Sequence, residues 1–483
     1  MDEKIFKKWN LILGWSSFLI AFIVYYLTSE PTVGFWDTGE YITTSAKLQV
    51  GHPPGAPLFQ MLGAIFSIFA LNSDQIGFTL NLMSGFASAL TIAFMFWSIT
   101  MLLSKISNNL SDSKDKSMAI LGAALTGSLA FTFTDTFWFN AVETETYAMG
   151  TLIMAVLFYL ALRWEQDMNS KRGNKWLVLI SFIIGLSFGI HFMGLLTIPA
   201  IVLIYFFKNY QTVNIKNFLI ANIAGVAIVM IVFKLILPPT LKFFSFMELF
   251  FVNDLGLPFN SGTIASFFLI ALLFYFILSY TSKKKLVTGN TLGLCVLFIF
   301  IGFSSWIMLP IRANADVVVN ENNPSTVREL LAYYNLEQYP KTYLFYGPLF
   351  TDQYSGLDEE NPYTDDKPKY EKDEKNGKYI VVNDYKNATQ NFNSKHASFL
   401  PRMWSPEHAE NYLRYSGFLN FKVKPKYISE NSITEIANDF KAKIQAEQVD
   451  YETFHKFLKQ YGQFLDIEKP SILSNIYYSL DFQ

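Results

Sequence analysis

The sequence predicts a mainly α-helical, polytopic membrane protein of about nine spans, followed by an extracytoplasmic α+β domain at the C-terminus. The first observation is composition: the 483 residues are 51% hydrophobic and 16% charged, whereas an ordinary soluble domain is about 25% charged. The second is charge placement, because residues 1–310 hold 33 charged side chains and residues 311–483 hold 45. We therefore expect a membrane domain over residues 1–310 and a soluble domain over residues 311–483.

The individual spans follow from the apolar runs, since a spanning helix needs about 20 apolar residues. Residues 57–71 form a shorter apolar run, which suits a helix lying at the membrane interface. The nine predicted spans lie at about residues 10–28, 77–104, 118–135, 146–163, 176–192, 193–207, 217–237, 263–281 and 290–310.

Lysine and arginine placement predicts the orientation, because cytoplasmic loops are enriched in these residues. If 57–71 does not span, the basic segments 105–117, 163–175 and 282–289 all share the side of the N-terminus. We therefore expect a multi-pass membrane protein with a cytoplasmic N-terminus and a C-terminal domain on the opposite side.

Charge and cysteine content exclude other classes. A net charge of −2 provides no basic field for nucleic acid. The single cysteine, Cys295, cannot form an internal disulfide or a cysteine-type metal site.

Ionisable residues gather on the predicted outer face, where they are costly and are therefore functional candidates. The outer loop 29–76 contains an acidic motif, Asp37-Thr38-Gly39-Glu40, and then a sequence that must turn, His52-Pro53-Pro54-Gly55. Further candidates on this face are Glu143, Glu145 and Tyr147 in the second outer loop, His191 at the end of a span, and Arg312 just after the last span.

These motifs resemble the GT-C superfamily of membrane glycosyltransferases. Within it, they look like a bacterial family, formerly a domain of unknown function, that is related to the eukaryotic transmembrane O-mannosyltransferase of plexin-type receptor domains. The residues that carry the resemblance, over about residues 10–420, are Gly34 to Glu40, His52 to Gly55, Trp138 to Tyr147, Leu309 to Arg312, Asn320 to Pro324 and Arg402 to Pro406.

The resemblance implies a GT-C-like fold. It also implies transfer of a sugar, expected to be mannose, from a polyprenyl-phosphate donor to serine or threonine hydroxyls of exported proteins. It also implies a bacterial inner membrane, with the C-terminal domain in the periplasm. The chemistry agrees in kind, because a hydroxyl nucleophile needs a carboxylate to accept its proton, and a phosphate leaving group is best held by Arg, Lys or His.

On this basis Asp37 is the expected general base, with Glu40 assisting it or orienting the acceptor. Glu143, Glu145 and Tyr147 are expected to shape the acceptor or sugar site. The expected contacts to the donor phosphate are Arg312, His191 and His52. Two acidic pairs on facing loops also suit a divalent cation, Mg²⁺ or Mn²⁺, held through oxygen ligands.

Each residue also has a structural interpretation. Asp37 and Glu40 have the spacing of a helix capping box. Glu143 and Glu145 share a face only in an extended loop and otherwise mark a solvated helix start. His191 suits an interhelical hydrogen bond as well as a ligand, and Arg312 suits an anchor at the headgroups.

Two other functions remain open from the sequence. A transporter or lipid flippase would use intramembrane carboxylates for ion coupling, although no internal repeat is seen. A non-catalytic envelope assembly factor would tolerate the loss of Asp37. Members of the bacterial family usually continue with further spans after the outer domain, so a chain ending at Gln483 is expected to be either trimmed or a fragment.

Overall fold

The computed structural model describes residues 3–106, 114–210, 212–339, 341, 343, 345–399, 408–471 and 473. The chain divides into two compact units, Met1–Gln338 and Tyr339–Gln483. The first unit thus includes a short segment beyond the last apolar helix. The expected boundary at residue 310, which separates membrane from soluble sequence, stays a prediction.

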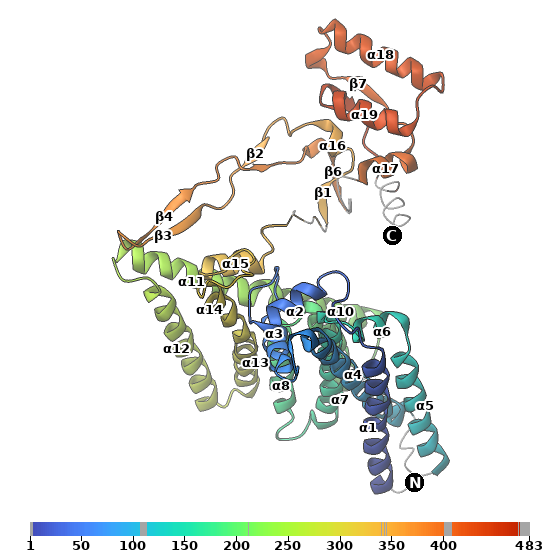
Figure 1. The fold of residues 1–483 in the computed structure, drawn as a ribbon, viewed down its shortest axis with the longest axis vertical. Helices are drawn as coiled ribbons and strands as arrows, with labels where there is room; N and C mark the ends of the chain where they lie inside the picture. Colours follow the sequence, from blue (N-terminus) through green and yellow to red (C-terminus); the bar gives the residue numbers. More distant parts are fainter. Residues whose placement is uncertain are drawn as a thin grey trace. The chain divides into compact units, whose positions relative to one another are not determined.

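The first unit is a bundle of long helices with short helices at one end (Figure 1). The short helices α2, α3 and α6 lie at the end that carries the two acidic loops. The helices are α1 (Glu3–Thr28), α2 (Thr38–Ala46), α3 (Pro57–Ser67), η1 (Ser73–Gln75), α4 (Ile76–Ile106), α5 (Lys114–Thr132), α6 (Asp135–Ala141), α7 (Thr146–Asp167), α8 (Asn174–Ser187), η3 (Phe192–Thr197), α9 (Ile198–Asn209), α10 (Ile215–Met230), η4 (Ile231–Ile236), α11 (Leu237–Leu249), η5 (Phe250–Asp254), α12 (Ser261–Lys283), α13 (Val287–Phe303), η6 (Ser304–Ile307), α14 (Met308–Ala313) and α15 (Val327–Tyr334).

The predicted polytopic fold class is confirmed. Within the described residues, seven helical segments are long and apolar enough to cross a bilayer, or eight if the bent pair α5–α6 is one span. All nine predicted spans coincide with helices. The count differs from nine because α8 has only 14 residues and because α5 meets α6 at a 68° bend.

Two stretches of the predicted outer surface are helical. The run at 57–71 forms α3, whose 11 residues are too few to span. The stretch after the seventh predicted span continues as α11 and η5 instead of an open loop. Glu248 at the end of α11 accepts hydrogen bonds from the backbone of Asn260 and Thr263, at 2.6 and 2.8 Å, and so fixes the start of α12.

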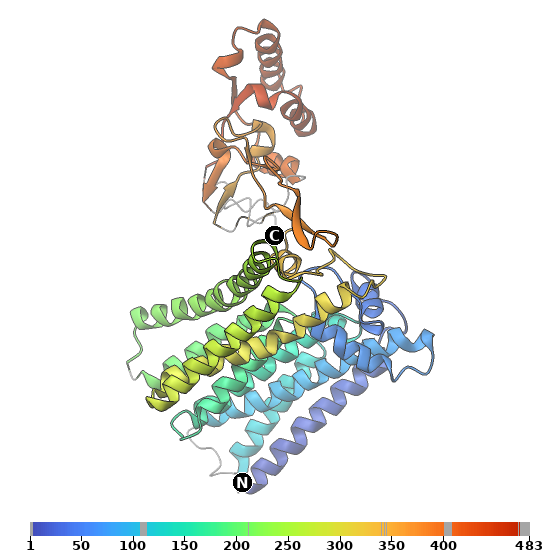
Figure 2. The ribbon, with the colours of Figure 1, turned by 90° about the vertical axis from the view of Figure 1, so that its left-hand side faces the viewer.

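Small residues allow the central helices to approach closely, as is usual in membrane bundles. The long helix α4 packs against α1, α5 and α7, and α8 packs against α13, so these helices run side by side (Figure 2). At the α8–α13 contact, a Cβ atom on Gly185 would lie 2.3 Å from the Ile299 carbonyl oxygen, and one on Gly302 would lie 2.4 Å from that of Phe182. Larger residues at these two positions would force the helices apart.

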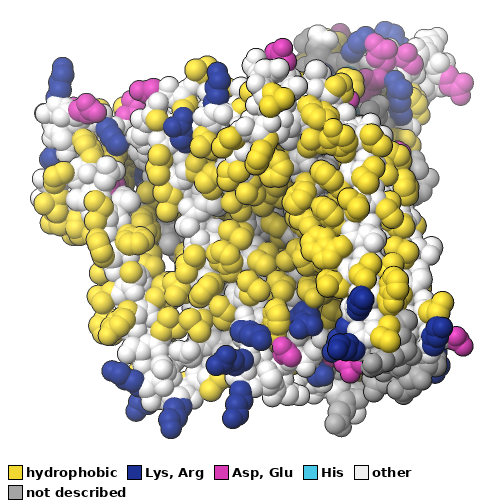
Figure 3. All heavy atoms as spheres, turned by 60° about the horizontal axis from the view of Figure 1, so that its bottom comes forward, with side chains coloured by type: hydrophobic (Ala, Val, Ile, Leu, Met, Phe, Trp, Pro, Cys, Tyr) yellow, Lys and Arg dark blue, Asp and Glu magenta, His cyan; other side chains and the backbone are white. Residues whose placement is uncertain are grey.

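The outer surface of the helical unit is strongly apolar. Figure 3 shows a broad hydrophobic face with Lys and Arg side chains gathered along one edge. This pattern is the one expected of a bundle surrounded by lipid with a basic rim. The assignment of that rim to the cytoplasm stays a prediction.

The second unit is a small α+β unit, and its described residues form four two-stranded antiparallel ladders. They pair β1 (Tyr346–Pro348) with β6 (Ala397–Phe399), β2 (Tyr363–Thr364) with β5 (Thr389–Gln390), β3 (Lys369–Asp373) with β4 (Lys378–Asn383), and β7 (Phe421–Val423) with β8 (Leu465–Ile467). Its helices are α16 (Asp352–Ser355), η7 (Ser394–His396), α17 (Ala409–Ser416), η9 (Pro425–Tyr427), α18 (Asn431–Gln445), α19 (Tyr451–Tyr461) and η10 (Gly462–Phe464). Aromatic side chains fill its core, including Phe350, Tyr412 and Phe454.

Candidate active site

The first acidic loop is organised by an ion pair between Glu40 and His52. Glu40 lies in the first turn of α2, and its carboxylate accepts hydrogen bonds from the His52 backbone N–H at 2.6 Å and from His52 Nδ1 at 3.0 Å. A Cβ on Gly51 would lie 2.7 Å from the Glu40 carboxylate. A glycine before His52 is therefore required for the loop to approach α2 this closely.

The same pair shifts the pKa values of both groups. Burial alone would raise the pKa of Glu40, but the hydrogen bonds and charge of His52 outweigh it, so the pKa of Glu40 is lowered. The hydrogen bond to Glu40 raises the pKa of His52 against the opposing effect of burial, and the charge of Asp37 adds to the increase. Each partner thus favours the charged form of the other.

Asp37 occupies the N-cap position of α2 without acting as a cap. Within the described residues, its side chain accepts no capping hydrogen bond from the first turn of the helix. Since Glu40 bonds His52, the capping-box interpretation is wrong. The Asp37 side chain is 59% exposed, and its Oδ2 lies 3.9 Å from His52 Nε2. It is therefore an accessible carboxylate beside an imidazole.

The second acidic loop is buried, which rules out the solvated helix start. Glu143 and Glu145 are 5% and 7% exposed. Glu145 has an extended backbone at the N-cap of α7, and its N–H bonds the Glu143 carbonyl at 2.9 Å. Both carboxylate side chains therefore project from a non-helical turn that precedes α7.

Burial of this loop raises the pKa values of its carboxyl groups. The pKa of Glu145 rises to about 7, mainly through burial and also through the charges of Asp37 and Glu143. Burial, together with the charge of Glu30, raises the pKa of Glu143. Glu145 is therefore divided between its protonated and ionised forms near neutral pH.

A buried asparagine in α4 joins the two loops. The Asn81 side-chain amide donates to the carbonyls of Glu30 and Thr32 in the first loop, at 2.7 and 3.0 Å. Its oxygen accepts a hydrogen bond from the Thr144 hydroxyl of the second loop. The first loop also donates from Glu30 N–H to the Val142 carbonyl at 2.9 Å. The acidic segments are thereby fixed against one another.

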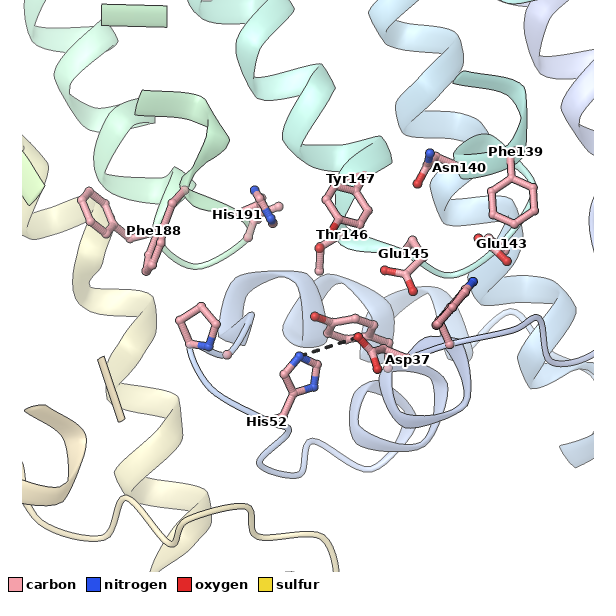
Figure 4. Close-up of a pocket in the computed structure, with 16 residues that line it drawn as sticks. Asp37, His52, Phe139, Asn140, Glu143, Glu145, Thr146, Tyr147, Phe188 and His191 are labelled. Atoms are coloured by element: carbon pink, nitrogen blue, oxygen red, sulfur yellow. Dashed lines mark ion pairs between the residues drawn. The ribbon is translucent and has the colours of Figure 1, made fainter. Parts of the chain in front are cut away.

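These segments enclose a pocket of about 490 Å³. Figure 4 shows Asp37 and Glu145 pointing toward one another across it, from the first loop and from the start of α7. Among the candidate residues, six line the pocket: Asp37, His52, Glu143, Glu145, Tyr147 and His191. The structure therefore brings together residues that are up to 154 positions apart in sequence, and Glu40 reaches the pocket through its bond to His52.

His191 makes a local hydrogen bond instead of the interhelical bond considered from the sequence, and its contact to the donor phosphate stays a prediction. Its Nδ1 accepts a hydrogen bond from the Met193 N–H at 3.1 Å, which assigns the proton of the neutral ring to Nε2. The ring lies 5.1 Å from that of Tyr147, centroid to centroid. His191 is thus a bonded histidine that also presents a pocket surface.

Arg312 is placed elsewhere. Its guanidinium bonds the backbone carbonyls of Leu48 and Lys47, the latter at 3.4 Å, and it is not one of the described residues that line the pocket. These bonds hold the segment that leads to His52, and the expected contact of Arg312 to the donor phosphate stays a prediction. The motif Arg402 to Pro406 lies outside the described residues.

Two further residues of the site were missed by the sequence reasoning. Tyr41 lines the pocket, with its ring 5.7 Å from that of His52, and burial, with the charge of Glu145, raises its pKa. Asn81 holds both loops in place through its side-chain hydrogen bonds. The sequence signal for Asn81 was an amide inside an otherwise apolar span, because such an amide is costly unless it is bonded. Tyr41 gave no sequence signal beyond its place beside Glu40.

The first loop also has the composition of a metal site. One ligand atom each from Asp37, Glu40 and His52 lies within 4.8 Å of the others. Two carboxylates and an imidazole suit a divalent cation with mixed oxygen and nitrogen preference. Protonated His52 balances the same carboxylates without a metal, so the geometry fits either arrangement.

The fold and the site together define a polytopic membrane protein with an acid-lined pocket between its two acidic loops. Residues 37–214 match the family described as the protein O-mannosyl-transferase TMEM260 N-terminal domain. This match includes every candidate residue except Arg312. Residues 340–480, close to the bounds of the second unit, match a family of unknown function, DUF8416.

Two curated proteins show the same relation. The chain is 26% identical over 226 residues to protein O-mannosyl-transferase tmem260 of Dictyostelium discoideum, which covers 44% of the chain and 26% of that protein. It is 27% identical over 165 residues to protein O-mannosyl-transferase TMEM260 of Mus musculus, covering 34% and 21%. The matches span about a quarter of these relatives' lengths. No solved structure matches the chain. The chain is thus related to the eukaryotic O-mannosyltransferases.

The Glu40–His52 pair predicts a pH window of stability. The raised pKa of His52 stabilises the fold fully below its ordinary value of 6.5, and this is lost as pH rises through the folded pKa. The lowered pKa of Glu40 stabilises it fully above 4.5, and this is lost as pH falls through the folded pKa. We expect the melting-temperature difference between wild type and Glu40→Gln, measured in EDTA, to be largest at about pH 5–6 and smaller on both sides.

Glu321→Gln is the matched control, because Glu321 is exposed and belongs to the same unit. Its difference from wild type should stay small at every pH. A Glu40→Gln difference that is constant from about pH 4 to pH 9 would contradict the ion pair.

Proposed function

We propose that this protein is a GT-C-type glycosyltransferase. In this proposal it moves a sugar, expected to be mannose, from a polyprenyl-phosphate donor to serine or threonine hydroxyls of exported proteins. The observation that carries the proposal is the accessible Asp37 carboxylate in a pocket shared with Glu145 and His191. The relation to the O-mannosyltransferases supports it, because the matched segment, residues 37–214, contains every described residue that lines this pocket except Trp36.

Asp37 is the general base of this reaction. The acceptor oxygen forms a bond to C1 of the sugar while the bond between C1 and the phosphate oxygen breaks, and the hydroxyl proton passes to Asp37. A hydroxyl is a weak nucleophile until a positioned base accepts its proton. Glu40 acts as a positioning residue, because it orients His52, which lies beside Asp37.

The second loop supplies contacts to the sugar and acceptor. With a pKa of about 7, Glu145 carries a proton for part of the time at neutral pH, so it can donate to a sugar oxygen as well as accept from a hydroxyl. Glu143 and Tyr147 complete this side of the pocket.

The leaving phosphate meets histidine in this pocket. No lysine or arginine is among the described residues that line it, so the groups assigned to the phosphate are the imidazole N–H donors of His191 and His52. Arg312 contributes by holding the chain that leads to His52. Mg²⁺ or Mn²⁺ on Asp37, Glu40 and His52 would supply further positive charge at the same place.

An apolar groove supports a lipid-linked donor. A second pocket, of about 360 Å³, lies among the membrane helices α4, α7 and α9 with η3. Its α7 wall is formed by Thr151, Met154, Ala155 and Phe158, which continue the helix face of Tyr147 at intervals of three to four residues. The groove therefore follows the helix that also bears the sugar pocket, as an isoprenoid chain attached through phosphate requires.

The proposed location of the protein is a bacterial inner membrane. The bacterial inner membrane, with the N-terminus in the cytoplasm and the second unit in the periplasm, would present the pocket to exported polypeptides. The basic edge of the apolar surface supports this orientation.

Asp37→Asn is expected to lower transfer by about a hundredfold or more, because the amide cannot accept the hydroxyl proton. The assay supplies polyprenyl-phosphate mannose and a serine/threonine peptide to the full chain in nanodiscs, and mass spectrometry detects one added hexose. Asp135→Asn is the control, since Asp135 is an exposed aspartate in the second outer loop. An EDTA lane reports the need for a metal.

Wild-type activity that Asp37→Asn leaves unchanged would contradict the assigned base. A folded wild-type protein that transfers no sugar from any lipid-linked donor would contradict the enzyme itself and favour transport or assembly.

Ala155→Trp is expected to fill the apolar groove and raise the KM for a long-chain polyprenyl-phosphate mannose about tenfold. A donor with a single isoprene unit should be unaffected, because it does not extend into the groove. Ala271→Trp on exposed α12 is the control. Equal effects of Ala155→Trp on both donors would contradict the lipid assignment.

A further inference from the structure

Trp36 is held in an unusual position beside Asp37. Its backbone has φ +59°, a conformation that bulky side chains rarely adopt and that costs stability. Its side chain is 89% exposed, so burial in the core does not offset this cost. Such strain is typical of positions that are held for a ligand.

The local chain explains how the position is maintained. Gly34 lies so close to the second loop that a Cβ there would be 2.6 Å from the Glu143 carboxylate. Three residues after Gly34, Asp37 is the N-cap of α2. The Asp37 carbonyl accepts a hydrogen bond from the Tyr41 N–H at 3.0 Å. The chain must turn sharply between these two fixed points, and the positive φ of Trp36 makes the turn.

Trp36 is one of three exposed aromatic residues that line the pocket. The others are Phe139, 50% exposed, and Tyr147, 48% exposed. They come from three separate segments: the first loop, α6 and α7. Carboxylates lie among them, namely Asp37, Glu143 and Glu145.

This combination suits a sugar. A pyranose ring presents an apolar face of C–H groups that packs on an aromatic ring, while its hydroxyls donate to carboxylates at its edge. Trp offers the largest aromatic face, and Trp36 is the pocket aromatic next to the assigned base.

An exposed Trp near a membrane also suits anchoring in the headgroups. Phe35, 79% exposed, is its neighbour in sequence and is not among the described residues that line the pocket. If both residues were anchors, loss of either would affect every lipid carrier alike. Phe35 is therefore the matched control.

We propose that Trp36 is the platform on which the apolar face of the donor sugar stacks, so that it determines binding of the sugar and not of the lipid. This rests on the proposed function, because it requires a glycosylated carrier in the pocket. Trp36 contacts the sugar ring and places its C1 beside Asp37.

The test compares binding of polyprenyl-phosphate mannose with binding of bare polyprenyl phosphate, using the full chain in nanodiscs. Wild type should bind the mannosylated carrier more tightly. In Trp36→Ala this preference should fall by about fivefold to tenfold, the size of an aromatic contact. Trp36→Phe should retain part of it, and Phe35→Ala should retain all of it.

Trp36→Gly separates binding from folding. Glycine adopts positive φ freely, so this variant should melt at or above the wild-type temperature while losing the sugar preference as Trp36→Ala does. A wild-type preference that survives in both Trp36→Ala and Trp36→Gly would overturn the platform alone. Equal weakening of both carriers by Trp36→Ala and Phe35→Ala would overturn it in favour of anchoring. A wild type that does not distinguish the carriers would overturn the proposed function as well.

Discussion

The hydrogen bonds of Asn81 are the constraint on which the site depends. An amide within a membrane helix is costly unless it is bonded, and Asn81 is fully buried in α4. Its donors are used by the first outer loop and its acceptor by the second. A single side chain of the bundle thus bonds two loop segments that lie more than 110 residues apart in sequence. Together with the backbone bond from Glu30 to Val142, these bonds hold Asp37 and Glu145 at one pocket.

The electrostatics of the two joined loops follow from the crowding of their carboxylates. Four carboxylates, those of Asp37, Glu40, Glu143 and Glu145, lie in or beside one pocket whose described lining contains no lysine or arginine. The imidazole of His52 stabilises the charge of Glu40, while Glu145, further from it, has its pKa raised to about 7. Different environments therefore give similar side chains different protonation states, as the proposed general-base mechanism requires.

The helical, polytopic fold was predictable because a 20-residue apolar run in lipid leaves the backbone only one way to satisfy its hydrogen bonds. The count of spans was less predictable, since the bend between α5 and α6 and the short α8 depend on packing. For the site, charges on the outer face indicated Asp37, Glu145 and His191. The position of Arg312 was not predictable, because its bonds to the backbone near Leu48 are set by tertiary contacts that no local pattern records. The capping box was wrong for a similar reason: His52, 12 residues away, competes for Glu40.

Sugar transfer in the pocket between the two acidic loops is tested most directly by a cryo-electron microscopy structure of the full chain in nanodiscs with polyprenyl-phosphate mannose. Density for the sugar is expected between Asp37 and Glu145, with the phosphate near His191 and the isoprenoid chain along α7 and α9. Density for the sugar elsewhere, or an isoprenoid chain bound only to the outer faces of α10 and α12, would contradict it.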